Sequence, residues 1–383
     1  MDAAGPLDGI RVLEFAGQGP GPFAAMMLAD MGAEVIRVDR DDEQEADGGV
    51  EAPRNPMLRG RRSIVLDLKR AEAVAVLLRM LPSIDAVIEG YRPGVMERLG
   101  LGPEVCAKAN PKLVYGRVTG WGQSGPMAHA AGHDINYIAL AGALDPIGRR
   151  GGPPVPPLNL LGDYASGGMY LAFGLVSALL EAQRSGRGQV VDAAMVDGAA
   201  HLTTTLRWKL ESRTWNLPRG TNMLDGGSHF YGVYETSDHK HVAIGAIEPR
   251  FYAELRRILG LEDPEWGRQL DQQMWPELTA KLASVFRTGT REHWCTRFAG
   301  AEACFTPVLD LVEAPAHPHH QSRGTFVERF GVTQPIPTPR LSRTPGRLRR
   351  PPPTPGQHSG ALLGEAGFST EEIAALRQKG AIR

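Results

Sequence analysis

The chain has 383 residues, too many for one small core and enough for about two domains. Its 42 Lys and Arg nearly balance its 43 Asp and Glu, for a net charge of -1, which excludes a general attraction to nucleic acid or an anionic membrane. No run approaches the ~18 apolar residues of a membrane span, and the first residues lack the basic and apolar regions of a signal peptide. We therefore expect a cytoplasmic protein without nucleic-acid or membrane partners.

Strands and helices are predicted to alternate through the first 120 residues. Apolar patterning predicts strands at 10–15, 34–39, 64–68, 86–89 and 112–118, separated by helices at 23–31, 71–81 and 95–99. Such alternation favours an α/β fold with a doubly wound, mostly parallel, Rossmann-like sheet.

The turn after the first strand is rich in glycine but does not match a dinucleotide fingerprint. Glycines stand at 17, 19 and 21, and the third glycine of G-x-G-x-x-G, due at 22, is Pro22. At the end of the second strand, Asp39 suits a ribose and Arg40 suits a phosphate. A solvated strand end explains either residue equally well.

Residues 41–56 are predicted to form a loop, after which three arginines occur within four positions. Arg59, Arg61 and Arg62 precede the strand predicted at 64–68. A site for a polyanionic ligand and a solvated charge run explain this cluster about evenly.

The second half of the chain has a different texture. An apolar helix at 165–183, predicted to be buried on several sides, is followed by a strand at 189–193 and a helix at 195–214. A hairpin at 231–237 and 241–246 then precedes helices at 249–259, 276–286 and 290–299. Residues 335–356 alternate Pro and Arg, which predicts an extended linker rather than a packed element. Ser369 and Glu372 form a capping box for a last helix at 370–379.

We accordingly divide the chain into three parts. Residues 1–195 form a large α/β domain to which 335–383 returns, 196–228 form a linker helix region, and 229–334 form a smaller α+β domain. The three cysteines, Cys106, Cys295 and Cys304, are odd in number and lack C-x-x-C spacing. We expect neither a disulfide framework nor a zinc site and interpret them as packing residues.

Three polar residues each precede or begin a predicted helix: His133, Asp163 and Glu248. Helix capping explains all three. Alternatively, His133 and Asp163, on opposite sides of an apolar segment, face one cavity and exchange protons, because both side chains can be tuned to titrate near neutral pH. A helix start at His133 would also offer backbone N–H groups to an oxyanion.

Taken in order, the motifs resemble CoA-transferase family III and, within it, the α-methylacyl-CoA racemases. The resemblance runs from about residue 6 to residue 343. Its motifs are at 19–22, 35–40, 89–94, 120–126, 132–137, 157–163, 191–198 and 245–249. The last motif, together with His133, is the most specific for the racemase branch, whereas the glycine-rich motifs are shared by the transferases.

The resemblance implies interconversion of (R)- and (S)-2-methylacyl-CoA thioesters by two-base proton transfer through an enolate. It implies that His133 and Asp163 are the acid/base groups and that Glu248 orients His133. Asn159 and the N–H of Asp134 would lie beside the enolate. No metal or nicotinamide cofactor is needed, because CoA is part of the substrate.

The resemblance also implies binding residues and an assembly. Arg40, Arg59 and Arg98 would bind CoA. Met195, Met223 and Tyr231 would contact the acyl chain, although core packing explains the two methionines equally well. Helices around 200–225 would thread through a second copy to give an interlocked homodimer. The Pro/Arg-rich stretch at 344–356 departs from the family pattern, and no role is transferred to it.

Two other functions remain open. A family III CoA-transferase would use Asp163 as a nucleophile, forming an anhydride and then an enzyme-CoA thioester; it has no need of a His133–Glu248 pair, so their joint presence favours the racemase. A non-catalytic CoA-binding module, in which these residues only cap helices, predicts that His133→Ala changes nothing but stability.

Overall fold

The computed structural model describes residues 5–40 and 54–383, and the chain divides into two compact units. The first unit comprises residues up to Ala141, Leu158–Leu202 and Gly324–Arg383, and the second comprises Gly142–Pro157 and Thr203–Arg323. Most of the loop predicted at 41–56 lies outside the described residues.

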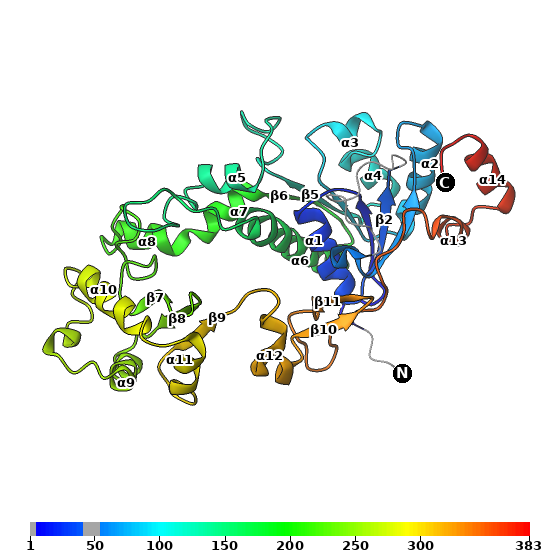
Figure 1. Cartoon of the computed structure of the whole chain (residues 1–383). Helices are drawn as coiled ribbons and strands as arrows, with labels where there is room; N and C mark the ends of the chain where they lie inside the picture. The colour runs from blue at the N-terminus through cyan, green and yellow to red at the C-terminus, as the bar shows by residue number, and fades with distance from the viewer. Residues whose placement is uncertain (1–4, 41–53) are drawn as a thin grey trace. The chain divides into compact units, whose positions relative to one another are not determined.

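A six-stranded, fully parallel sheet organises the first unit (Figure 1). Its strands are β1 (Arg11–Phe15), β2 (Glu34–Asp39), β3 (Arg61–Val65), β4 (Ala86–Glu89), β5 (Val114–Thr119) and β6 (Val190–Ala194). They lie in the order β3-β2-β1-β4-β5-β6. This is the doubly wound order, in which the direction of winding reverses between β1 and β4. The parallel sheet predicted from the alternation is confirmed.

Helices cover both faces of this sheet because its strands are apolar on both sides. Val12 and Val35 pack on the face of α1 (Pro20–Asp30) and α6 (Tyr170–Ser185), whereas Leu13 and Ile36 pack on the opposite face. That face is covered by α2 (Ala71–Met80), α3 (Val95–Arg98), α4 (Pro103–Ala109) and α13 (Ser359–Glu365). The first unit also contains two short 3₁₀ turns, at Pro56–Leu58 and Leu81–Ser83, and the helix α7 (Met195–Leu202), which directly follows β6.

The longest helical segment is only half buried. A π-helical stretch, η5 (Leu160–Met169), continues directly into α6, and the combined 26 residues are long and apolar enough to cross a membrane by length and composition. One side packs on the sheet, which accounts for much of that apolar composition. The prediction of burial on several sides is wrong, because Phe173 is 74% exposed and Leu180 is 50% exposed.

The second unit contains a three-stranded antiparallel sheet of β7 (Tyr231–Glu235), β8 (His241–Gly245) and β9 (Phe305–Val308). The predicted hairpin β7–β8 is confirmed. Its helices are α8 (Thr204–Glu211), α9 (Pro249–Leu259), α10 (Trp275–Phe286), α11 (Arg291–Arg297) and α12 (Pro318–Arg323), with 3₁₀ turns at Pro264–Gly267 and Ala314–Ala316. Aromatic side chains dominate its core. The single helix predicted at 195–214 is in fact two, α7 and α8, interrupted at Thr203.

The C-terminal segment returns to the first unit. A hairpin of β10 (Phe326–Arg329) and β11 (Val332–Pro335) precedes a stretch without helix or strand up to α13, and α14 (Thr370–Gln378) begins at the predicted capping box. The Pro/Arg-rich stretch is extended as predicted, but it is packed: Arg347 N–H donates to the Asp30 carbonyl, Arg350 accepts from Gly60 N–H, and Pro352 and Pro353 are buried. The prediction of an unpacked linker is therefore wrong.

The arginine cluster proves to be neither a solvated charge run nor an open anion site. Arg59, Arg61 and Arg62 are 4%, 0% and 8% exposed. Arg61 pairs with the fully buried Glu14 at 3.0 Å, and Arg62 pairs with Glu365 at 2.7 Å. The sequence misleads here because the carboxylate partners come from distant elements. The packing interpretation also fails for Cys304, which is exposed.

Candidate active site

A cavity of about 670 Å³ opens at the point where the sheet reverses its winding. The loop after β1 (Gly17, Gly19) and the loop after β4 (Gly90, Arg92) both line it. In open parallel sheets, ligands bind beyond the carboxyl ends of the strands at this point, because the two loops diverge there. His133 and Asp163 line the same cavity, so the structure brings together the pair singled out in the sequence.

His133 is the N-cap residue of α5 (Asp134–Leu140), so the predicted helix start is confirmed. Its side chain is exposed, whereas its main-chain N–H and carbonyl both form hydrogen bonds with Asn136. His133 N–H donates to Asn136 Oδ1 at 3.0 Å, and the His133 carbonyl accepts from Asn136 N–H at 2.8 Å. The imidazole is therefore carried on a fixed backbone.

The aromatic side chains of Tyr137 and Trp121 pack beside Gly132, the residue before His133. The Tyr137 hydroxyl donates to the Gly132 carbonyl, and its ring meets Trp121 edge to face at 4.8 Å between centroids. A Cβ at Gly120 would lie 2.0 Å from the Tyr137 ring, and one at Gly132 would lie 2.8 Å from it. Both glycines are therefore required for the ring to fit between the two chain segments.

Asp163 lies in the first turn of η5, where Asn159 is the N-cap residue, so the simple capping role for Asp163 is wrong. The side chain of Asp163 is half-buried, and its Oδ2 accepts from Asn159 Nδ2 at 3.2 Å. Burial raises the pKa of this carboxyl, the Asn159 hydrogen bond lowers it, the negative charge of Asp134 raises it, and His133 lowers it. The net direction is upward, toward the range in which a carboxyl can act as an acid.

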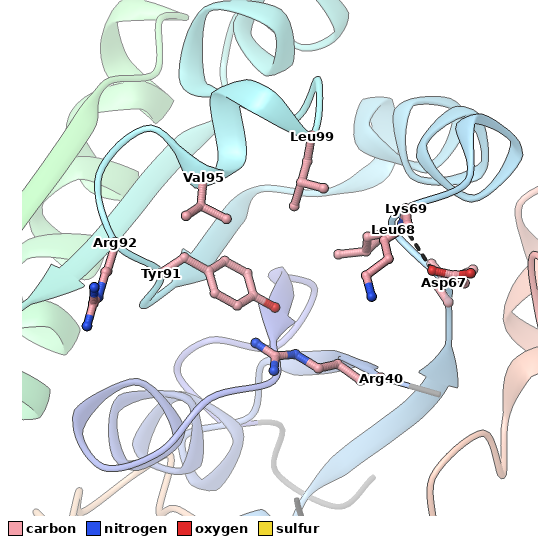
Figure 2. A pocket seen from close by; sticks show the side chains of 9 residues that line it. Arg40, Asp67, Leu68, Lys69, Tyr91, Arg92, Val95 and Leu99 are labelled. Atoms are coloured by element: carbon pink, nitrogen blue, oxygen red, sulfur yellow. Dashed lines mark hydrogen bonds between the residues drawn. The ribbon is translucent and has the colours of Figure 1, made fainter. Parts of the chain in front are cut away.

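A second cavity of about 620 Å³ adjoins the first, and the two share Arg40, Tyr91 and Arg92. Figure 2 shows the Tyr91 ring near the middle of this cavity, with the guanidinium of Arg40 reaching toward it. That guanidinium lies 5.3 Å from the ring centroid. Lys69 adds a further cation, Asp67 adds one carboxylate that pairs with Arg70, and Val95 and Leu99 add apolar surface. The lining suits an anionic ligand that also carries a flat ring.

A buried ion pair holds the loop that carries Tyr91 and Arg92. Glu89 is fully buried, and its two oxygens accept from Tyr91 N–H at 2.7 Å and from Arg117 Nε at 2.7 Å. Arg117 also binds Glu97. The motif at 89–94 begins at the last residue of β4, which neighbours β1 at the reversal point, but nothing in the sequence alone assigns a role to Tyr91 or Arg92.

The predicted ligand-binding residues divide by position. Arg40 and Met195 line the first cavity, and Met195 is 6% exposed. Arg98 is exposed on α3 outside both sets of lining residues. Arg59 is 4% exposed, and its guanidinium binds Asp30 through two bonds, at 2.9 and 2.6 Å, and Gln334 at 3.0 Å. Its contact with CoA stays a prediction.

The remaining predicted residues belong to the second unit. Glu248 is the exposed N-cap residue of α9. Met223 packs partly against the core of that unit, and Tyr231 on β7 is 37% exposed. The orientation of His133 by Glu248 and the acyl contacts of Met223 and Tyr231 stay predictions.

Comparisons with known proteins agree over nearly the whole chain. The model of CoA-transferase family III matches residues 7–359. The alpha-methylacyl-CoA racemase of Mus musculus is 48% identical over 373 residues, which cover 97% of this chain and 96% of that protein. The alpha-methylacyl-CoA racemase of Homo sapiens is 47% identical over 372 residues, covering 96% and 95%. A crystal structure of a CAIB/BAIF family protein from Brucella suis matches with a TM-score of 0.81 at 25% identity, covering 95% of this chain and 100% of that one.

Proposed function

The chain belongs to CoA-transferase family III, and from this premise we propose that it interconverts the two epimers of 2-methylacyl-CoA thioesters. The observation that carries the proposal is the cavity at the reversal point, which both His133 and Asp163 line. The racemases at 48% and 47% identity over nearly their full length give its substrate class.

Inversion of a carbon beside a thioester requires two proton-transfer groups. One group removes the α-proton from one face, and the other delivers a proton to the opposite face. His133 and Asp163 serve as this pair, each acting as base for one epimer and as acid for the other. The raised pKa of Asp163 favours its acid role, since a carboxyl with an ordinary pKa would hold almost no proton at neutral pH.

The intermediate is an enolate, whose oxygen requires hydrogen-bond donors that are already in place. The main-chain N–H of Asp134 is our candidate donor, and Asn159 adds a polar group beside Asp163. Removing one comparable donor costs about 3 kcal/mol of transition-state stabilisation in oxyanion holes. Met195 supplies adaptable apolar surface in the same cavity.

The CoA portion occupies the second cavity. Arg40, Arg92 and Lys69 suit its phosphates, and Tyr91 offers a ring face to adenine. Because both cavities share Arg40, Tyr91 and Arg92, one extended ligand can reach from the cationic cavity to the acid/base pair.

The direct test incubates a single 2-methylacyl-CoA epimer with the protein in deuterated water. We expect α-deuterium incorporation together with loss of optical purity. Absence of exchange across several acyl chains would refute the racemase proposal.

Variants separate the two bases. Asp163→Asn should abolish inversion of both epimers. His133 should still exchange the α-proton with solvent in the one epimer from which it removes that proton. His133→Gln should show the complementary pattern. His129→Gln is the matched control, because His129 is an exposed histidine four residues away that does not line the cavity. Equal loss of exchange from both epimers in Asp163→Asn would instead indicate that Asp163 is needed for binding.

The CoA-transferase is the competing outcome on the same site. Transfer of CoA to a free carboxylate acceptor, abolished by Asp163→Ala and insensitive to His133→Gln, would establish it. The placement of His133 in the cavity favours the racemase, since an anhydride-forming carboxylate has no need of a second base.

We also propose a cytoplasmic homodimer. Helix α8 has no buried residue and leaves Trp208 65% exposed, and α6 leaves Phe173 74% exposed, so each unit offers an apolar face suited to a second copy. Sedimentation analysis of the protein and of Trp208→Glu tests the assembly. A wild-type monomer at micromolar concentration would exclude it.

A further inference from the structure

The side chain of Asp134 contacts the main chain of Asp163, although Asp134 directly follows His133 in the sequence. Asp134 is 6% exposed, and its Oδ2 accepts from Asp163 N–H at 2.7 Å. One carboxylate therefore ties the start of α5, which carries His133, to the turn that carries Asp163.

This hydrogen bond depends on a glycine. A Cβ at Gly162 would lie 2.4 Å from Asp134 Oδ2 and 3.0 Å from Asp134 Cα. Since side chains essentially never approach so closely, any other residue at 162 would displace the carboxylate from the Asp163 amide.

The hydrogen bond alone does not explain why a carboxylate stands at this position. The second oxygen, Oδ1, is buried and has no hydrogen-bond partner among the residues that the structure describes. An asparagine could accept the same bond without the desolvation of a charge, which is the larger penalty. The negative charge acts instead on its neighbour, since Asp134 raises the pKa of Asp163 in addition to the effect of burial.

We propose that Asp134 is a positioning residue for the racemisation: its buried carboxylate holds Asp163 beside His133 and places a second acidic side chain next to it. The role rests on the proposed function. The other titratable groups that face Asp163 are His133 and Tyr137, and Arg40 and Arg92 line the same cavity. Asp134 differs from these groups because its side chain also accepts a hydrogen bond from the Asp163 main chain.

Asp134→Asn tests the charge while keeping an acceptor for the Asp163 amide. The carboxyl band of Asp163, identified by its loss in Asp163→Asn, is followed through pH by infrared difference spectroscopy. We expect its midpoint to move to lower pH in Asp134→Asn. In the pH profile of kcat/KM, the limb that reports the titration of Asp163 should shift to lower pH by the same amount. Asp134→Ala, which also removes the acceptor, should lower kcat on the order of 10²-fold through misplacement of Asp163.

Asp192→Asn is the matched control, because the exposed Asp192 also accepts a main-chain N–H, that of Gln123 at 3.0 Å. It should leave the Asp163 midpoint and the pH profile unchanged. Wild-type kcat in folded Asp134→Ala, or an unaltered Asp163 midpoint in folded Asp134→Asn, would overturn the inference. If the wild type exchanges no α-proton, the racemase proposal fails, and the infrared titration still decides whether Asp134 acts on Asp163.

Discussion

Acidification should destabilise the second unit through one buried histidine. His229 is fully buried, its Nε2 lies 2.8 Å from the Tyr252 hydroxyl, and its Nδ1 has no hydrogen-bond partner among the described residues. The rings of Phe230, Tyr252 and Trp266 surround the imidazole. Burial lowers the pKa of His229 from 6.5 to about 4.

The sign follows from which state binds the proton. The unfolded chain protonates His229 as the pH falls below 6.5, whereas the folded chain does so only near 4. The neutral His229 therefore makes its full contribution to the free energy of unfolding above pH 6.5 and loses it as the pH falls toward 4. The free energy of unfolding should fall by about 2 kcal/mol at pH 5 and by about 3 kcal/mol at the acid limit.

The assay is urea unfolding at pH 7.5 and pH 5, followed by tryptophan fluorescence, in the wild type and in His229→Gln. Glutamine can retain a hydrogen bond to Tyr252 but does not titrate. The loss of stability on acidification should be smaller in the variant by about 2 kcal/mol. Other titrating groups cancel in this comparison. Equal losses in the two proteins would refute the argument.

Three further substitutions test the packing and ion pairs of the first unit. Glu89→Gln should raise KM for acyl-CoA more than it lowers kcat, because the carboxylate that binds Tyr91 N–H and Arg117 is lost from the start of the Tyr91–Arg92 loop. Steady-state kinetics and calorimetric CoA binding measure this. A decrease in kcat with unchanged KM would contradict it. Gly120→Ala should cost about 1–3 kcal/mol by overpacking and lower kcat, since its Cβ would clash with Tyr137; denaturation and turnover decide. Arg61→Met should cost about 3–5 kcal/mol, because Glu14 stays buried with a weaker partner, and unchanged unfolding would disprove this.

Most of the fold could be predicted because its strands are short apolar runs bounded by glycine, proline or polar residues. The bounds of β2, β4 and α9 match the sequence prediction, since each begins and ends at a clear change of pattern. Strand β3 was placed three residues late because Arg61 and Arg62 look like surface residues. Their partners, Glu14 and Glu365, are far away in the sequence, and no local pattern reveals such a pairing.

The site could be predicted only where a motif carries a chemically active side chain. The sequence singles out His133 and Asp163 in this way, and both line the cavity, while their acid/base roles stay predictions. The sequence does not single out Tyr91 and Arg92, which line both cavities, because neither is unusual alone. Their signal is topological, since a loop after β4 matters only once β4 is known to neighbour β1. The hydrogen bond between Asp134 and Asp163 joins the first turns of α5 and η5, which are separate in the sequence, and no local pattern reveals it.

The distribution of charge along the two cavities argues for one orientation of the ligand. Arg40 and Arg92 line both cavities, and the second cavity adds Lys69 and one carboxylate, Asp67, which is paired with Arg70. The three cations outnumber the carboxylate. The first cavity, but not the second, contains Asp163, whose N–H binds the buried carboxylate of Asp134. A polyphosphate is attracted by the cations and repelled by the carboxylates, so it settles away from Asp163. The uncharged thioester is then the part of the ligand left beside His133 and Asp163, where we propose that the proton transfer takes place.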